Sequence, residues 1–189
     1  MQIIQTSIPG VLIIEFKRVS DRRGFFAELF RAERYAPLNS GAPFVQDNWS
    51  RSSRGILRGL HLQHPNDQTK LVSVLRGEIL DVAVDVRVGS PTYGAHVAVV
   101  LSEENGRQFL VPRGFAHGFL VLSETADIFY KCDNYYSPAD ELVVRWNDPA
   151  IGIEWPVTNP TLSNRDAAAP LLADTKGLPH FADRQCVSS

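Results

Sequence analysis

Apolar and polar residues alternate along much of this chain, and this alternation is the first guide to its structure. Between residues 80 and 87, leucine and valine occupy every second position, and aspartate, alanine and arginine lie between them. A period of two is typical of a β-strand with one apolar and one polar face. Similar patterns predict strands near residues 11–17, 43–50, 56–63, 69–76, 95–101, 107–111, 117–122, 126–132 and 141–146. Residues 32–38 and 166–173 are predicted to form short helices.

Turn-forming residues separate these strands at short intervals. Examples are Pro9-Gly10 and Asn105-Gly106, whose residue types adopt the backbone angles that tight turns need. Many short strands between turns favour an all-β fold, a sandwich or jelly roll with a few short helices. A length of 189 residues suits one core. We therefore expect one domain over residues 1–189, with a polar, loosely held tail at 177–189.

The charge pattern argues against polyanionic partners. Nineteen basic and 21 acidic residues give a net charge of -2, and they form no Lys/Arg run, so neither nucleic acid nor a membrane is expected as a partner. The apolar stretch at residues 11–14 is too short for a membrane span and lacks the flanks of an export signal. The two cysteines, Cys132 and Cys186, form no CxxC pair. Read as ordinary thiols, they favour a reducing, cytoplasmic location.

The predicted strand at residues 56–63 has a polar face that carries a histidine. Gly59, His61 and Gln63 share this face, whereas Leu60 and Leu62 share the other. Taken alone, His61 fits two roles: a hydrogen-bonded structural imidazole or a group that takes part in chemistry.

A second polar face precedes it in the chain. Gln46, Asn48 and Ser50 alternate with Val45, Asp47 and Trp49, which again gives hydrogen-bonding side chains at a period of two. Two such faces could line one cavity, and this possibility favours a functional role for the histidine.

Part of the chain resembles the cupin motifs. Residues 106–117 are similar to the second motif, in which Pro and Gly shape a turn that directs a histidine inward. The first motif is half present, because Gln63 and Lys70 stand where metal-binding cupins carry His and Glu. An ammonium group would repel a divalent cation, so no metal is expected. Lys70 itself fits either a solvated strand end or a fixed cation that stabilises an enolate oxygen.

Several motifs in one order resemble the dTDP-4-dehydrorhamnose 3,5-epimerase family over residues 3–173. The matching segments are DRRGFFAE at 21–28, FVQDN at 44–48, LRGLHLQ at 57–63, QTKLV at 68–72, DVAVDVR at 81–87, SPTYG at 90–94, PRGFAHGF at 112–119, YK at 130–131, NYYSP at 134–138, WND at 146–148, IEWP at 153–156 and LSNRD at 162–166. The resemblance implies a cupin-type jelly roll and a 3,5-epimerase that turns dTDP-4-dehydro-6-deoxy-D-glucose into dTDP-4-dehydro-L-rhamnose for dTDP-L-rhamnose biosynthesis.

The resemblance also implies roles for four residues. His61 would be the general base and Asp166 its carboxylate partner, which fixes the imidazole tautomer. Tyr130 would be the acid that returns a proton from the opposite face, with Lys70 or Lys131 near enough to lower its pKa. Lys70 would hold the oxygen on carbon 4.

A further set of residues would line the substrate site by the same resemblance. These are Arg23, Glu28, Gln46, Asn48, Arg58, His117, Tyr136, Glu141 and Arg165. Strict alternation places Arg58 on the strand face opposite His61, so direct contact requires a twist, a bulge or the edge of the site. Tyr136 is expected either to contact the thymine or sugar or to be core.

The resemblance further implies a homodimer in which N-terminal strands pair across the interface. No cofactor is expected, since proton transfer needs none and the chain has no GxGxxG motif. Three alternatives stay open: an epimerase of a dTDP-4-keto sugar that acts at one carbon, a metal-dependent cupin oxygenase or isomerase, and a module that binds nucleotide sugars without turnover.

Overall fold

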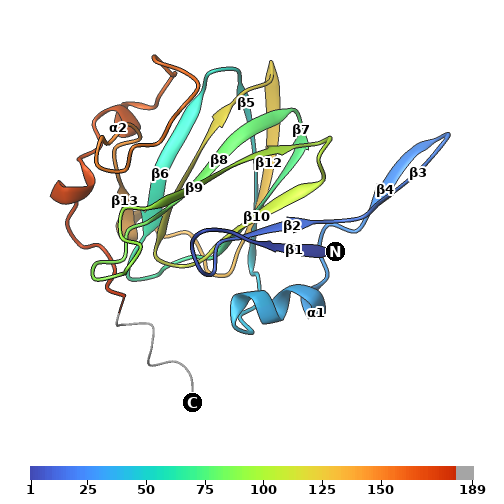
Figure 1. Cartoon of the computed structure of the whole chain (residues 1–189), viewed down its shortest axis with the longest axis horizontal. Coiled ribbons are helices and arrows are strands. Elements are labelled where there is room, and N and C mark those ends of the chain that lie inside the picture. The colour runs from blue at the N-terminus through green and yellow to red at the C-terminus, as the bar shows by residue number, and fades with distance from the viewer. Residues whose placement is uncertain (182–189) are drawn as a thin grey trace.

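Two antiparallel sheets face each other in the computed structural model, which describes residues 1–181 (Figure 1). The six-stranded sheet has the order β1 (Gln2–Gln5), β2 (Leu12–Glu15), β10 (Arg107–Val111), β7 (Lys70–Arg76), β12 (Thr125–Cys132) and β5 (Gln46–Ser53). The five-stranded sheet has the order β13 (Glu141–Val143), β6 (Leu57–Gln63), β11 (Phe115–Val121), β8 (Glu78–Asp85) and β9 (His96–Ser102). The prediction of an all-β jelly roll of the cupin type is confirmed.

The main core lies between the two sheets, because each sheet turns one row of alternating apolar side chains toward the other. Val72, Phe109 and Ile128 of the six-stranded sheet are fully buried with Ile79 and Leu101 of the five-stranded sheet. The outer face of the six-stranded sheet is partly covered by the segment that contains α1 (Ala32–Tyr35) and the 3-10 turn η1 (Ala36–Asn39).

The predicted strands are found with small shifts. The strand expected at 43–50 is Gln46–Ser53, and the helix expected at 32–38 is a helical turn followed by a 3-10 turn, as Pro37 cannot supply a backbone N–H. The helix expected at 166–173 begins earlier, at Asn164, because Ser163 Oγ accepts the Asp166 N–H as an N-cap. That helix, α2 (Asn164–Ala167), is followed by a separate 3-10 turn, η3 (Leu172–Asp174).

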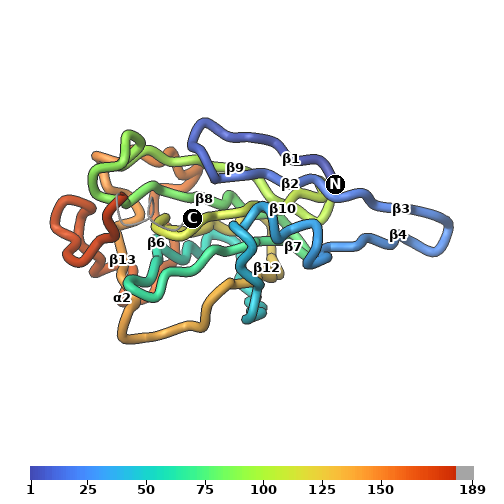
Figure 2. Tube along the Cα trace, turned by 90° about the horizontal axis from the view of Figure 1, so that it is seen from below, coloured from blue at the N-terminus to red at the C-terminus, as the bar shows by residue number. Residues whose placement is uncertain are grey.

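Three N-terminal strands were not predicted. They are β1, β3 (Arg18–Asp21) and β4 (Gly24–Ala27). Most of their residues are exposed, so they carry no alternation of buried and exposed positions. The β3–β4 hairpin forms its own two-stranded sheet and extends away from the body of the molecule in both views (Figures 1 and 2). None of the helices within residues 1–181 has the length and apolar character of a membrane span.

Candidate active site

The candidate active site is a cavity of about 280 Å³ between the two sheets. One wall belongs to the six-stranded sheet and carries Gln46, Asn48, Lys70, Tyr130 and Cys132. The other wall belongs to the five-stranded sheet and carries His61, Gln63 and Glu141, while Gln68 and Tyr136 come from loops. The two polar strand faces seen in the sequence therefore do line one cavity.

An irregularity in β6 brings Arg58 to the same side as His61. His61 pairs with His117 of β11, but Arg58 pairs with Phe119, so three steps along β6 match two along β11. The extra residue is a β-bulge, which reverses the side of the strand that each later side chain faces. Arg58 Nε donates to Ser52 Oγ of the six-stranded sheet at 3.1 Å, so its side chain points between the sheets.

Glycines permit this close crossing of β6 and β11. Gly59 has a φ of +129°, and a Cβ there would lie 2.6 Å from the Gly118 Cα. A larger residue at position 59 would therefore separate the two strands at the bulge.

His61 and Asp166 form a dyad at one end of the cavity. His61 Nε2 lies 2.6 Å from Asp166 Oδ1, and the Asp166 carboxylate is 3% exposed. Burial raises the pKa of Asp166, but hydrogen bonds from His61, the Ser163 side chain and the Gly59 backbone outweigh this effect, and the pKa lies below its usual value. Asp166 is therefore an anion at neutral pH. It holds Nε2, whereas Nδ1 hydrogen-bonds no residue of 1–181 and is available to accept a proton.

Tyr130 and Lys70 occupy the opposite wall. In the strand register Tyr130 lies beside Val72, and Cys132 lies beside Lys70. Burial raises the pKa of Tyr130, and only the positive charge of Arg58 among its main influences opposes this. Burial lowers the pKa of Lys70, an effect that the neighbouring Cys132, Glu141 and Asp81 partly offset.

The expectation that a lysine lowers the pKa of Tyr130 was wrong. Lys131 faces away from the cavity, where its Nζ binds Asp47 Oδ1 at 2.7 Å, and Lys70 is not among the groups that set the pKa of Tyr130. The phenol is instead held firmly in its protonated form by burial.

Tyr136, Glu141 and Arg165 meet at the mouth of the cavity. The Tyr136 hydroxyl donates to Glu141 Oε2 at 2.8 Å, and Arg165 donates both to that carboxylate and to the Glu141 backbone oxygen. A second cavity of about 330 Å³ adjoins this mouth and is lined in part by Arg58, His61 and Arg165. The guanidinium groups of Arg58 and Arg165 offer N–H donors suited to an anionic group such as a diphosphate, although Arg165 is also paired with Glu141.

His117 lies behind the wall of the cavity. Its Nε2 is 2.6 Å from Asp81 Oδ1, and both side chains are buried. His117 is not among the residues that line the cavity. Asp81 Oδ2 has no hydrogen-bond partner within residues 1–181.

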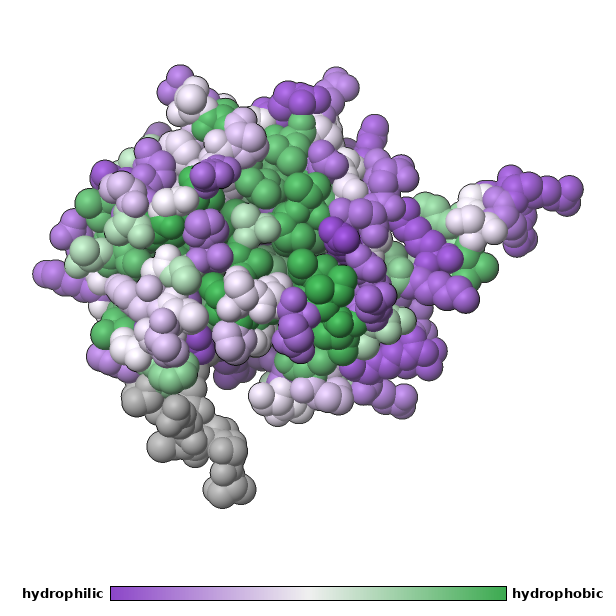
Figure 3. Space-filling view, in the orientation of Figure 1, coloured by the Kyte–Doolittle hydropathy of each residue, from purple (hydrophilic) through white to green (hydrophobic). Residues whose placement is uncertain are grey.

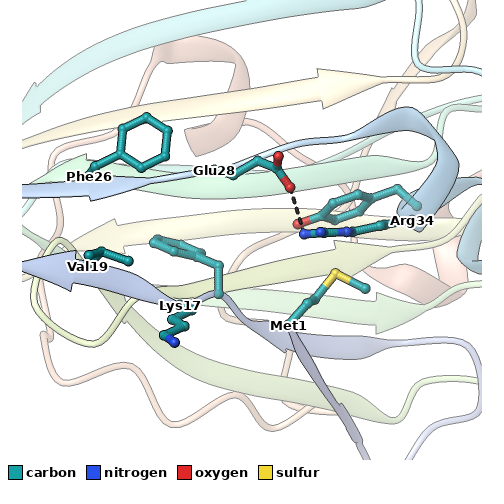
Figure 4. A pocket seen from close by; sticks show the side chains of 8 residues that line it. Met1, Lys17, Val19, Phe26, Glu28 and Arg34 are labelled. Carbon is teal, nitrogen blue, oxygen red and sulfur yellow. Dashed lines mark hydrogen bonds and ion pairs between the residues drawn. The ribbon is translucent and has the colours of Figure 1, made fainter.

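Arg23 and Glu28 lie on the N-terminal side of the molecule, in and next to the projecting hairpin. Arg23 Nη2 binds Asp21 Oδ2 at the tip, where the Arg23 side chain is 83% exposed. Glu28 lines another hollow of the surface with Phe26 and Lys17, where its carboxylate binds Arg34 (Figure 4). Glu28 also binds Arg31. Within this chain, neither residue reaches the cavity that holds His61.

Four lining residues were not among the predicted site residues, namely Leu62, Gln63, Gln68 and Cys132. Alternation had placed Gln63 on the polar face of its strand and Leu62 on the other face. A signal for Gln68 and Cys132 exists in the sequence, because Gln68 precedes Lys70 by two positions and Cys132 follows Tyr130 by two. Burial raises the pKa of the Cys132 thiol to about 11, so it is neutral. Cys186 lies outside the described residues.

No three histidine, cysteine or acidic side chains gather as a possible metal site anywhere in residues 1–181. At the positions where metal-binding cupins carry His and Glu, the Gln63 carboxamide is engaged with backbone groups and the Lys70 ammonium faces the cavity. The donor set therefore does not fit a divalent metal.

Comparison with known proteins agrees with this geometry. The family model of dTDP-4-dehydrorhamnose 3,5-epimerase matches residues 5–174. The epimerase of that name from Salmonella typhimurium is 54% identical over 91% of this chain and 96% of its own. A dTDP-6-deoxy-D-glucose-3,5-epimerase from Legionella pneumophila, solved in complex with dTDP-4-keto-L-rhamnose, is 52% identical, covers 95% of this chain and 98% of its own and has a TM-score of 0.92.

Another solved relative has a different regiochemistry. It is a 3′-monoepimerase from Streptomyces bikiniensis in complex with dTDP-quinovose, and it is 38% identical over 95% of this chain and 94% of its own, with a TM-score of 0.89. Family model, relatives and fold agree over nearly the whole described chain, and the chain belongs to the dTDP-4-dehydrorhamnose 3,5-epimerase family, whose members are isomerases.

Proposed function

We propose that this chain inverts carbons 3 and 5 of dTDP-4-dehydro-6-deoxy-D-glucose and so forms dTDP-4-dehydro-L-rhamnose for dTDP-L-rhamnose biosynthesis. The observation that carries the proposal is the placement of the base and acid on opposite walls of one cavity: His61 on the five-stranded sheet and Tyr130 on the six-stranded sheet. Inversion of a carbon requires that a proton leave from one face and return to the other.

Proton removal falls to His61. The ketone on carbon 4 acidifies the protons on carbons 3 and 5, and a neutral imidazole can remove them near neutral pH. With Nε2 bound to Asp166, the proton is taken by Nδ1, and the buried carboxylate stabilises the imidazolium that forms.

Lys70 stabilises the enolate. Its ammonium lies on the wall opposite His61, and a cation in a buried setting acts strongly on the negative charge that develops on the carbon 4 oxygen. Tyr130 lies on β12, the strand next to the one that carries Lys70. It then donates its phenolic proton to the face of the enolate opposite His61. Its raised pKa keeps that proton in place until the enolate forms.

The nucleotide is bound at the mouth of the cavity. Arg58 and Arg165 supply positive charge for the diphosphate, and Tyr136, which is half exposed, offers an aromatic surface to the thymine or sugar. Gln46 and Asn48, which hydrogen-bond each other at 3.0 Å, present amides to the sugar hydroxyls.

A homodimer accounts for the position of Arg23 and Glu28. The hairpin exposes three large apolar side chains, Val19, Phe25 and Phe26, which are 59%, 61% and 73% exposed. Val19 and Phe26 are cross-strand partners and share one face of the hairpin, and exposed apolar surface of this kind commonly marks a protein interface. Pairing of N-terminal strands between two copies would cover these side chains and carry Arg23 and Glu28 toward the partner's cavity. We propose a cytoplasmic location, because Cys132, the cysteine within residues 1–181, is a free, buried thiol.

Incubation with dTDP-4-dehydro-6-deoxy-D-glucose in heavy water, followed by NMR, tests the proposed function. We expect deuterium at both carbon 3 and carbon 5, with the L-rhamno configuration in the product. Exchange and inversion at carbon 3 alone would identify a monoepimerase, the activity of the Streptomyces bikiniensis relative. Binding without exchange at either carbon would identify a binding module.

A further inference from the structure

The loop at residues 133–137 connects the two sheets across the mouth of the cavity. It leaves β12 of the six-stranded sheet and leads to β13 of the five-stranded sheet. Its two aromatic residues, Tyr135 and Tyr136, are 67% and 50% exposed. Since these side chains bury little apolar surface, the position of the two tyrosines depends largely on hydrogen bonds to the backbone around them.

Gln63 supplies two of those hydrogen bonds. Its Nε2 donates to the Tyr135 carbonyl at 2.9 Å, and its Oε1 accepts from the Ser137 N–H at 3.1 Å. The carbonyl of one residue and the N–H two positions later are the pair that a strand offers to its neighbour in a sheet. One buried carboxamide therefore replaces a neighbouring strand, and its Nε2 also donates to the Asn66 carbonyl.

Two other glutamines complete the attachment. Gln46 Oε1 accepts from the Tyr136 N–H at 2.8 Å, and Gln68 Nε2 donates to the Asn134 carbonyl at 2.9 Å. Gln46 belongs to the six-stranded sheet and Gln63 to the five-stranded sheet. The loop is thus tied to both walls of the cavity.

This attachment sets the position of Tyr136. Its hydroxyl binds Glu141, and Glu141 lies directly opposite Gln63 in the pairing of β13 with β6. Gln63 therefore holds the loop backbone next to Glu141, the residue that accepts the hydrogen bond from the Tyr136 hydroxyl. In contrast, His61, Lys70 and Tyr130 lie on strands and do not depend on the loop.

We propose that Gln63 is a positioning residue that acts on the sugar nucleotide through Tyr136. It keeps the loop against the mouth of the cavity, so that Tyr136 and Glu141 form a wall for the bound substrate. The inference rests on the proposed function, which supplies the identity of the substrate. It extends that function because it gives Gln63 the role of holding the loop and not of contacting the substrate.

The variant Gln63→Glu is the most direct test. It keeps the shape of the side chain but removes the amide donors and turns a carboxylate toward the Tyr135 and Asn66 carbonyls. Loss of these buried hydrogen bonds should raise KM for dTDP-4-dehydro-6-deoxy-D-glucose about tenfold, whereas kcat for exchange at carbon 5 should change less than about threefold. Hydrogen exchange of the Ser137 amide should become faster in the same variant.

A double-mutant cycle with Tyr136→Ala separates positioning from general destabilisation. If Gln63 acts through Tyr136, the double variant should have the KM of Tyr136→Ala alone. Independent, additive effects on KM, or a loss confined to kcat, would overturn the proposal. Gln68→Glu, which removes one hydrogen bond to the loop, should change KM in the same direction by less and serves if Gln63→Glu does not fold.

Binding of dTDP measured by calorimetry distinguishes this proposal from the proposed function. A wild-type protein that binds dTDP but does not exchange protons would contradict the proposed reaction. The effect of Gln63→Glu on dTDP affinity, alone and with Tyr136→Ala, would then still decide the role of Gln63. Unchanged affinity in a folded variant with a faster-exchanging loop would count against it.

Discussion

The cavity and the β3–β4 hairpin are built in opposite ways. In the cavity, His61, Lys70 and Tyr130 sit on strands whose neighbours fix their register, and Asp166 of α2, which binds His61, has a carboxylate that is 3% exposed. On the hairpin, two strands pair only with each other, and the charged group at the tip, Arg23, is 83% exposed. Figure 3 shows the same contrast, with the hairpin standing out from the body and ending in a hydrophilic tip.

The difference indicates which parts of the site one chain can organise. A buried group that is hydrogen-bonded within a sheet has its position and protonation state set by its own chain. An exposed ion pair on a projecting hairpin contributes little to stability. A hairpin with exposed phenylalanines gains a defined position only when another surface covers them.

The largest effect is expected at the base. His61→Ala should lower both epimerisation and deuterium exchange by about a hundred- to ten-thousand-fold, the usual contribution of a general base. NMR in heavy water measures both rates, and thermal unfolding checks the fold. Near-normal exchange in the folded variant would exclude His61 as the base.

Tyr130→Phe should separate exchange from inversion. The variant retains His61 and Lys70, so the enolate still forms, and the imidazolium can return deuterium to the face from which it took the proton. We expect exchange at carbon 5 to exceed inversion by about tenfold or more. Equal losses of both rates together with lower stability would mean that Tyr130 fills space, and Tyr136 would become the next candidate for the acid.

The contrast between the two regions also explains what the sequence could predict. Alternation placed His61, Gln46 and Asn48 on strand faces that do meet in one cavity. It failed for Arg58, because an extra residue in β6 changes the side that it faces. Gly59 within the strand is the local sign of such a bulge, but strict alternation does not count it.

Long-range contacts were out of reach for residue patterns alone. The 2.6 Å approach of Asp166 to His61 joins residues 105 positions apart, and the pairing of the two was proposed from family resemblance. The β3–β4 strands were missed because both of their faces are largely exposed, so the periodicity that reveals a half-buried strand is absent.

A charge introduced on the apolar face of the hairpin tests whether this face forms an interface. Phe26 is the most exposed of the three apolar side chains of the hairpin. We expect Phe26→Asp, which introduces a carboxylate at this position, to convert a dimer to monomers and to raise KM about tenfold. Analytical ultracentrifugation and steady-state kinetics measure these effects. Ser20→Asp, on the same hairpin and also exposed, adds one negative charge without removing an apolar side chain and is the matched control. Dimers that persist in Phe26→Asp would remove this face from the interface.

The pH dependence of kcat should report the buried lysine. Burial lowers the pKa of Lys70 from 10.5, and the enolate is stabilised only by the protonated form. Activity should therefore fall as pH rises through that lowered pKa, earlier than an exposed lysine would require. Lys70→Arg, whose guanidinium keeps its charge, should move this alkaline limit upward even if it lowers the rate. An unchanged limit would assign it to another group.

Removal of metal should have the smallest effect on either region. The positions that would carry metal ligands in a cupin hold Gln63, engaged with the loop backbone, and Lys70, whose ammonium would repel a divalent cation. Dialysis against a strong chelator should leave kcat and KM within about twofold, and elemental analysis should find no stoichiometric metal. If a chelated, inactive protein regained activity only when one particular metal was added, Lewis-acid chemistry would take the place of the role proposed for Lys70. It would also require ligands other than the side chains that line this cavity.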